Sequence, residues 1–124
     1  MYATQLAAYK TVQKEAMSGR EIEALALTQA ALRLTECQKN WDAPDHETKL
    51  GEALKINQMV WTIFQGELMK EDNPLPKKLK ADILSLSLFI DKRIFQVMAD
   101  PAPEKLTAII NINLNLAAGL KGQP

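Results

Sequence analysis

Apolar residues recur every three or four positions along most of the chain, which is the spacing of one face of an α-helix. This pattern predicts five helices, over residues 3–16, 18–41, 45–71, 76–98 and 104–120. Their predicted core positions are Leu6, Tyr9, Val12, Ala16, Ala26, Leu27, Ala30, Leu34, Cys37, Trp41, Leu50, Leu54, Trp61, Phe64, Leu68, Leu79, Ile83, Leu86, Ile90, Ile94, Val97, Leu106, Ile109, Ile110, Ala117 and Leu120. Residues 110–116 alternate like a strand, but a lone strand would have no partner, so we assign them to the last helix.

Proline-containing breaks and a helix-start signal separate these helices. Ser18 with Glu21 three positions later forms a capping box, in which both side chains satisfy free amides at a helix start. Residues 42–44, 72–76 and 100–103 contain proline, which ends helices because it cannot donate a backbone hydrogen bond. Helices of similar length with short joints predict an all-α, single-domain antiparallel bundle of about five helices over residues 1–124.

Charge and targeting signals narrow the class of protein. Lys and Arg number 15, as do Asp and Glu, and this balance disfavours nucleic acid and anionic membranes as partners. The chain lacks a run of about 18 apolar residues, and its start lacks a signal-peptide apolar region, so we expect no membrane insertion and a cytoplasmic location. The single Cys37 cannot form an internal disulfide, which agrees with a reducing compartment.

Candidate catalytic chemistry is sparse. His46 and Cys37 are the only residues of their kinds, and neither has the spacing of a metal site or of a nucleophile with its base. We expect Cys37 in the core and His46 in solvent. No glycine-rich phosphate loop occurs among the five glycines. The sequence therefore predicts a protein that is not an enzyme, with no catalytic residue, metal or cofactor.

Two helices carry more apolar residues than one packing face can use. The second stripes are Ile56, Met59 and Ile63 on the third helix and Leu84, Leu88 and Phe95 on the fourth. Either the first and last helices cover these stripes, or the stripes form a groove for an amphipathic segment of another protein. Asn57 and Asn113 lie within apolar faces, so they need partners, either in neighbouring helices or in the backbone of a bound chain.

The strongest motif is a pair of blocks, Val60-Trp-Thr-Ile-Phe64 and Glu71-Asp-Asn-Pro-Leu-Pro76. Further blocks are Ala30-Ala-Leu-Arg-Leu34, Trp41-Asp42, Pro103-Glu-Lys-Leu106 and Ala117-Ala-Gly-Leu120. Over nearly its whole length the chain resembles the FlaF family of flagellar biosynthesis regulators. The residues that carry this family motif are Trp61, Phe64, Asp72, Asn73, Pro74, Leu75 and Pro76. The first 21 residues are also similar to the start of the FliS flagellin chaperones, which are small helical bundles.

The resemblance implies a cytoplasmic, non-catalytic protein that binds a flagellin terminal segment, supports flagellin synthesis and secretion, and works alongside FlbT-type regulators. On this reading the two apolar stripes, Ile56, Met59, Ile63, Leu84, Leu88 and Phe95, bind the partner. An alternative is a post-transcriptional regulator that contacts flagellin messenger RNA through Lys77, Lys78 and Lys80. A purely structural oligomer is the third possibility.

Overall fold

A computed structural model describes residues 19–122, which fold as four α-helices and one short 3-10 helix and contain no strand. The elements are α2 (Gly19–Lys39), α3 (His46–Leu68), α4 (Lys77–Ala99), η1 (Pro103–Leu106) and α5 (Thr107–Leu120). The predicted all-α class is confirmed, and the alternating run at residues 110–116 is helical as predicted. The helix predicted over residues 3–16 and its neighbour Ser18 lie outside the described residues.

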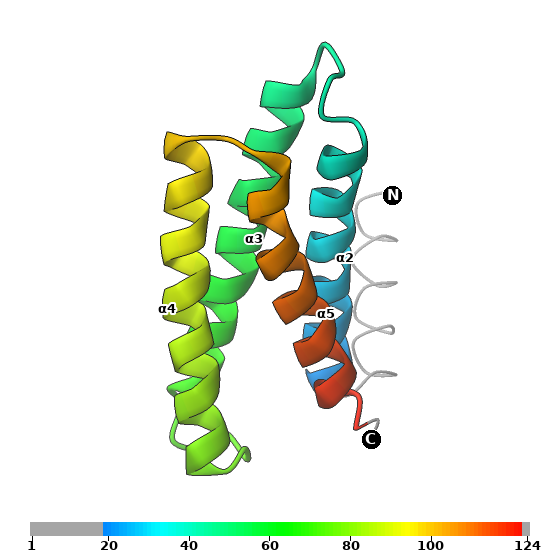
Figure 1. The fold of residues 1–124 in the computed structure, drawn as a ribbon. Coiled ribbons are helices and arrows are strands. Elements are labelled where there is room, and N and C mark those ends of the chain that lie inside the picture. Colours follow the sequence, from blue (N-terminus) through cyan, green and yellow to red (C-terminus); the bar gives the residue numbers. More distant parts are fainter. Residues whose placement is uncertain (1–18, 123–124) are drawn as a thin grey trace, which may run out of the picture.

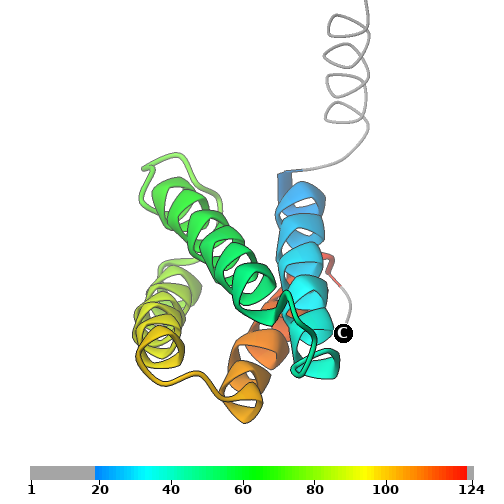
Figure 2. The same ribbon diagram turned by 90° about the horizontal axis from the view of Figure 1, so that it is seen from above.

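Consecutive helices run in opposite directions along the molecule (Figure 1). Helix α5 lies beside α2, although the two are far apart in the sequence, and α3 packs on α2 and is linked to α5 by hydrogen bonds of buried side chains. Helix α4 lies beside α3 on the side away from α2, as the view from above shows (Figure 2). The described residues therefore consist of a three-helix group and a fourth helix, α4, which packs mainly on α3 and has smaller contacts with α5 and η1.

Small side chains bring α2 close to its neighbours. Ala24, Ala30 and Ala31 are completely buried. Because the alanine side chain is only a methyl group, neighbouring helix backbones can approach closely at these positions. At the end of α2, the Gln38 side chain donates to the Pro103 carbonyl oxygen at 2.8 Å and to the Thr107 hydroxyl at 3.0 Å. These contacts fix the end of α2 against the start of α5.

A buried polar network joins the same three helices. The Asn113 amide nitrogen on α5 donates to Asn57 Oδ1 on α3 at 2.6 Å and to the Leu27 carbonyl oxygen on α2 at 3.4 Å. The indole nitrogen of Trp61 donates to Asn113 Oδ1 at 2.9 Å, and Asn57 Nδ2 donates to the Ala30 carbonyl oxygen at 3.1 Å. All three side chains are completely buried. The prediction of interhelical partners for both asparagines is therefore confirmed.

Helix α4 is held mainly by apolar contacts with α3. Its buried positions include Ile83, Ile90 and Ile94, which share one face by their helical spacing. One polar contact supplements them, because the Gln65 side-chain nitrogen donates to the buried Ser87 hydroxyl. In contrast to α2, α3 and α5, α4 contributes nothing to the asparagine network.

Of the predicted core positions within residues 19–122, most are buried and four are not; Leu6, Tyr9, Val12 and Ala16 lie outside the described residues. Leu79 was assigned to the core but is 41% exposed, so that prediction is wrong. Ala26, Trp41 and Leu86 are only half-buried. For Leu79 and Leu86 the reason is that α4 packs closely on one helix only, α3. Its apolar side chains therefore present more area than α3 can cover.

The network yields the first prediction. Replacing Asn113 by Leu should lower the free energy of unfolding by at least about 2 kcal/mol, because the Trp61 N–H and Asn57 Oδ1 both lose a buried partner, at about 1–3 kcal/mol each. Urea unfolding followed by circular dichroism measures the change. Asn115→Leu, at an exposed position of the same helix, is the matched control and should change stability by less than about 0.5 kcal/mol. Equal stability of the two variants would contradict the prediction.

Candidate functional site

The six predicted partner-binding residues differ in exposure. Four of them are more than half exposed, namely Met59 (54%), Ile63 (63%), Leu88 (70%) and Phe95 (72%). Ile56 and Leu84 are half-buried, and Leu84 packs against the core. We refer to the six residues together as the outer face. Among the described residues, α2 and α5 leave the four exposed members of this face uncovered.

The register of α3 and α4 aligns the two halves of the outer face. The helices are antiparallel and meet at the contact between Gln65 and Ser87. Ile63 stands two positions before Gln65, and Leu88 stands one position after Ser87, so the two lie at nearly the same height. At about 1.5 Å per residue, Phe95 lies roughly 10 Å further along α4 than Leu88, level with Ile56 and Met59.

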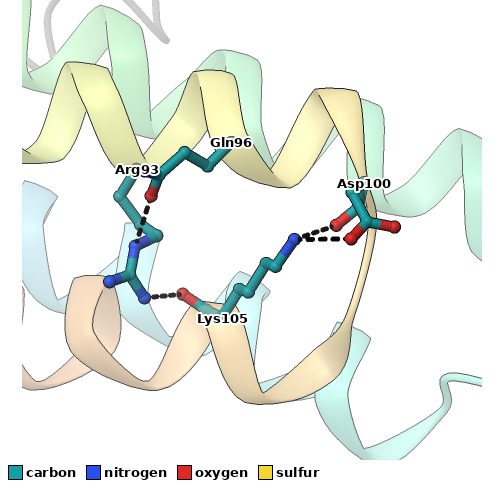
Figure 3. Close-up of polar contacts among 4 residues, drawn as sticks. All are labelled: Arg93, Gln96, Asp100 and Lys105. Atoms are coloured by element: carbon teal, nitrogen blue, oxygen red, sulfur yellow. Dashed lines mark hydrogen bonds and ion pairs between the residues drawn. The ribbon is translucent and has the colours of Figure 1, made fainter.

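A polar corner adjoins Phe95 where α4 leads into η1 (Figure 3). Arg93 donates from Nε to Gln96 Oε1 at 3.1 Å and from a terminal guanidinium nitrogen to the Lys105 carbonyl oxygen at 3.2 Å. Lys105 Nζ in turn donates to the Asp100 carbonyl oxygen at 2.6 Å and pairs with its carboxylate at 3.1 Å. These residues and Phe95 line a hollow of about 470 Å³, in which Phe95 is the large apolar side chain.

The aromatic half of the family motif belongs to the core. Trp61 is completely buried and Phe64 nearly so, and their rings meet edge to face with centroids 6.0 Å apart. Such aromatic pairs add about 0.5–1.5 kcal/mol beyond the area that they bury. Trp61 also belongs to the asparagine network. The prediction that Trp61 is a core residue is confirmed, and this part of the motif maintains the fold.

The second half of the motif shapes the turn between α3 and α4. Asn73 Nδ2 donates to the Glu67 carbonyl oxygen at 3.1 Å, and Asn73 Oδ1 accepts from the Leu75 amide at 3.0 Å. Leu75 is buried, although the sequence analysis did not place it in the core. Pro76 directly precedes α4, and its carbonyl oxygen accepts the first helical bond, from Lys80. Asp72 and Pro74 are exposed. The turn thus docks on the core through Leu75 and is closed by Asn73.

A hollow of about 460 Å³ lies beside this turn and is lined by Gly19, Arg20, Glu23, Glu67, Lys70, Asp72, Asn73, Pro74 and Leu75. Burial, and to a smaller extent the charge of Glu67, raises the pKa of Glu23, while Arg20 opposes the shift. The raised pKa means that the Glu23 carboxylate is less favourable in the folded chain than in water. Lys70, which pairs with Glu67 at 3.0 Å, supplies positive charge at the same hollow.

Cys37 and His46 line a third hollow, of about 430 Å³, at the joint between α2 and α3. Cys37 is buried as predicted, and burial, followed by the charge of Glu36, raises the pKa of its thiol, which keeps the sulfur protonated and weakly nucleophilic. His46 differs from the prediction of a solvated side chain, because its ring packs at 4.0 Å on that of Trp41 and its Nδ1 is buried without a hydrogen-bond partner.

The basic residues of the alternative RNA-binding hypothesis lie in the first turn of α4. Lys77 and Lys78 are exposed and Lys80 is half-buried. Over residues 19–122, no group of three or more His, Cys, Asp or Glu side chains is arranged to hold a metal ion. Within the same part of the chain, no helix combines the length and the apolar character needed to cross a membrane.

The turn yields the second prediction. Asn73→Ala should lower the free energy of unfolding by about 1–2 kcal/mol, because two hydrogen bonds that close the turn are lost. Thermal unfolding measures the loss. Asp72→Ala, at the exposed neighbouring position, is the control and should unfold like the unaltered protein within about 0.5 kcal/mol. If both variants unfold alike, the asparagine does not hold the turn.

The third prediction concerns Glu23. Its pKa is raised in the folded state, so the folded chain binds the proton more tightly than the unfolded chain and gains stability as the pH falls. Glu23→Gln should therefore raise the melting temperature at pH 7, where the carboxylate is charged. The gain should shrink towards the ordinary carboxyl pKa of about 4.3, where both states become protonated. A gain that stays constant from pH 7 to pH 4 would instead indicate a packing effect.

Comparison with known proteins places the chain in a family. The family model described as flagellar protein FlaF matches residues 5–120, which is nearly the whole chain and includes both blocks of the motif. Neither a curated protein nor a solved structure matches the chain. The chain belongs to the FlaF family of flagellar proteins.

Proposed function

We propose that this FlaF-family protein is a cytoplasmic, non-catalytic regulator of flagellar biosynthesis that binds flagellin and supports its synthesis and secretion in the manner of a chaperone. The bound part is a flagellin terminal segment, and the outer face of α3 and α4 is the binding surface. An FlbT-type regulator is a second partner in the same process. Membership of a flagellar family supports a role in a flagellar process, and the outer face supplies an apolar surface that an amphipathic segment could cover.

The observation that carries the proposal is the exposure of Met59, Ile63, Leu88 and Phe95 on one side of the α3 and α4 pair. Contiguous apolar patches on a protein surface mark interaction sites, because leaving them in water is unfavourable. An amphipathic segment that must stay unassembled before export requires such an apolar surface more than a charged one. Met59 adds a flexible side chain that can adapt to a variable partner.

The free energy gained by burying the outer face is comparable to the cost of ordering the bound segment. Full burial of one large apolar side chain contributes about 1.5–3 kcal/mol, so covering the exposed fractions of these four contributes roughly 4–8 kcal/mol. Ordering an unfolded segment costs about 2–5 kcal/mol. The burial therefore offsets the ordering, and polar contacts at the rim, for example with the exposed Lys92, add to the remainder.

A second candidate function rests on the first turn of α4. Lys77 and Lys78 are exposed there, and the turn contains no acidic residue. These cations could contact the phosphates of flagellin messenger RNA. Binding to phosphates weakens steeply as the salt concentration rises, whereas apolar binding does not. Flagellin binding is the better supported of the two, because the apolar surface is larger than this basic cluster, whose neighbour Lys70 is already paired with Glu67.

The fourth prediction tests the outer face. Phe95→Asp and Ile63→Asp should each weaken binding to a flagellin terminal peptide by at least about thirtyfold, because a carboxylate replaces an apolar contact. Calorimetric titration measures the affinity, and circular dichroism should show an unchanged helical signal because both positions are mostly exposed.

Gln29→Asp, which adds the same charge at an exposed position of α2, is the matched control and should bind like the unaltered protein. Normal binding by both outer-face variants would show that flagellin binds elsewhere or not at all. Loss of the helical signal in both would mean that the outer face is part of the core. A Lys77→Glu and Lys78→Glu double variant that alone loses binding to RNA would favour the second candidate.

A further inference from the structure

Helix α4 has apolar side chains on two opposite flanks. Leu88 and Phe95 lie on the outer face, whereas Leu79 lies about 160–180° and Phe89 about 100–120° away from them around the axis, at about 100° per residue. Leu79 is 41% exposed and Phe89 38% exposed. A helix with apolar side chains on several sides is usually covered by other elements or by a partner on those sides. Within residues 19–122, α3 covers only the side between the two flanks.

The contacts of Arg93 show which elements the flank with Leu79 and Phe89 faces. The guanidinium of Arg93 lies 5.3 Å from the centre of the Phe89 ring and also donates to the Lys105 carbonyl oxygen in η1. Phe89 and Arg93 therefore stand on the side of α4 that turns towards η1 and α5. Arg93 reaches across at the end where the two helices are joined, and α4 and α5 diverge towards the other end, where Leu79 lies (Figures 1 and 3). We refer to Leu79 and Phe89 as the α5-facing flank.

The area of the outer face alone is small for the partner proposed above. A fully exposed large apolar residue presents about 200 Å², so its four exposed side chains offer roughly 500 Å². Segments that order on binding bury about 1,000–3,000 Å² in total, or roughly 500–1,500 Å² on each partner. The outer face reaches only the bottom of that range. The α5-facing flank adds roughly 160 Å² of apolar surface on the same helix.

We propose that the partner segment contacts α4 on both free flanks, so that it wraps around this helix instead of lying along one side of it. The inference rests on the proposed function, because the occupant is the flagellin terminal segment. It requires two apolar stretches in that segment, separated by enough residues to cross over the exposed back of α4. The exposed back of α4 carries the polar side chains Ser85, Lys92 and Gln96. These side chains can hydrogen-bond the backbone of the partner segment where it crosses the helix.

The fifth prediction separates the two flanks. In calorimetric titration of the full-length protein with a flagellin terminal peptide, Leu79→Asp and Phe89→Asp should each weaken binding by at least about tenfold. Both variants should fold. Leu79 stands in the first turn of α4, where a carboxylate interacts favourably with the helix dipole, and Asp at position 89 would lie near Arg93. Gln29→Asp on α2 is again the matched control.

Several outcomes would overturn the inference. Normal binding by Leu79→Asp and Phe89→Asp, with loss in Phe95→Asp, would confine the partner to the outer face and leave the proposed function intact. Normal binding by all three variants would overturn the proposed function together with the inference. If light scattering shows that the protein self-associates and that Leu79→Asp abolishes this, a second copy covers the flank instead. A lower melting temperature of Leu79→Asp without peptide would point to cover from within the chain.

Discussion

The hydrogen bonds of Asn113 link all three helices of the group, α2, α3 and α5, and fix how they lie against one another. A buried amide must find partners at fixed positions, since leaving one unpaired costs about 1–3 kcal/mol. Its nitrogen reaches α2 and α3, and its oxygen accepts from the Trp61 indole. Apolar side chains could slide by a turn and still be covered, but these bonds form in one register only. Network bonds of this kind specify which of several similar packings the chain adopts.

Helix α4 takes no part in this network, so the proposed binding surface is separate from the contacts that fix the fold. The network and the alanine contacts of α2 hold α2, α3 and α5 together, while α4 depends on apolar contacts with α3, on the Gln65 to Ser87 bond and on the bond from Arg93 to the Lys105 carbonyl oxygen. Residues on the free sides of α4 are therefore able to vary without disturbing the core. The proposed binding residues of α4 thus stand on a helix that is supported by a rigid neighbour.

Periodicity predicted the helices well because a 3.6-residue repeat reports directly which side of a helix is apolar. It predicted Trp61, Phe64 and the two asparagines correctly, since each lies in the middle of an apolar stripe. It failed at Leu79, because a stripe does not reveal how many neighbours a helix has. The sequence analysis also missed Phe89 and Arg93. Their only signal was the helical spacing of Leu79, Leu86 and Phe89, which the sequence analysis had attributed in part to the core. The shared hollow of Cys37 and His46 depends on how two helices meet, which no local pattern records.

The pairing of α2 with α5 has a consequence for synthesis on the ribosome. The first described helix finds its main partner in the last one, and contacts such as Gln38 with Thr107 join residues 69 positions apart. Because the chain emerges from its N-terminal end, the alanine face of α2 and one side of Trp61 stay uncovered until α5 has left the exit tunnel. Such long-range closure slows folding relative to local helix pairing. A growing chain of this protein therefore exposes part of its apolar core until α5 has been made, and the three-helix group closes only after α5 emerges.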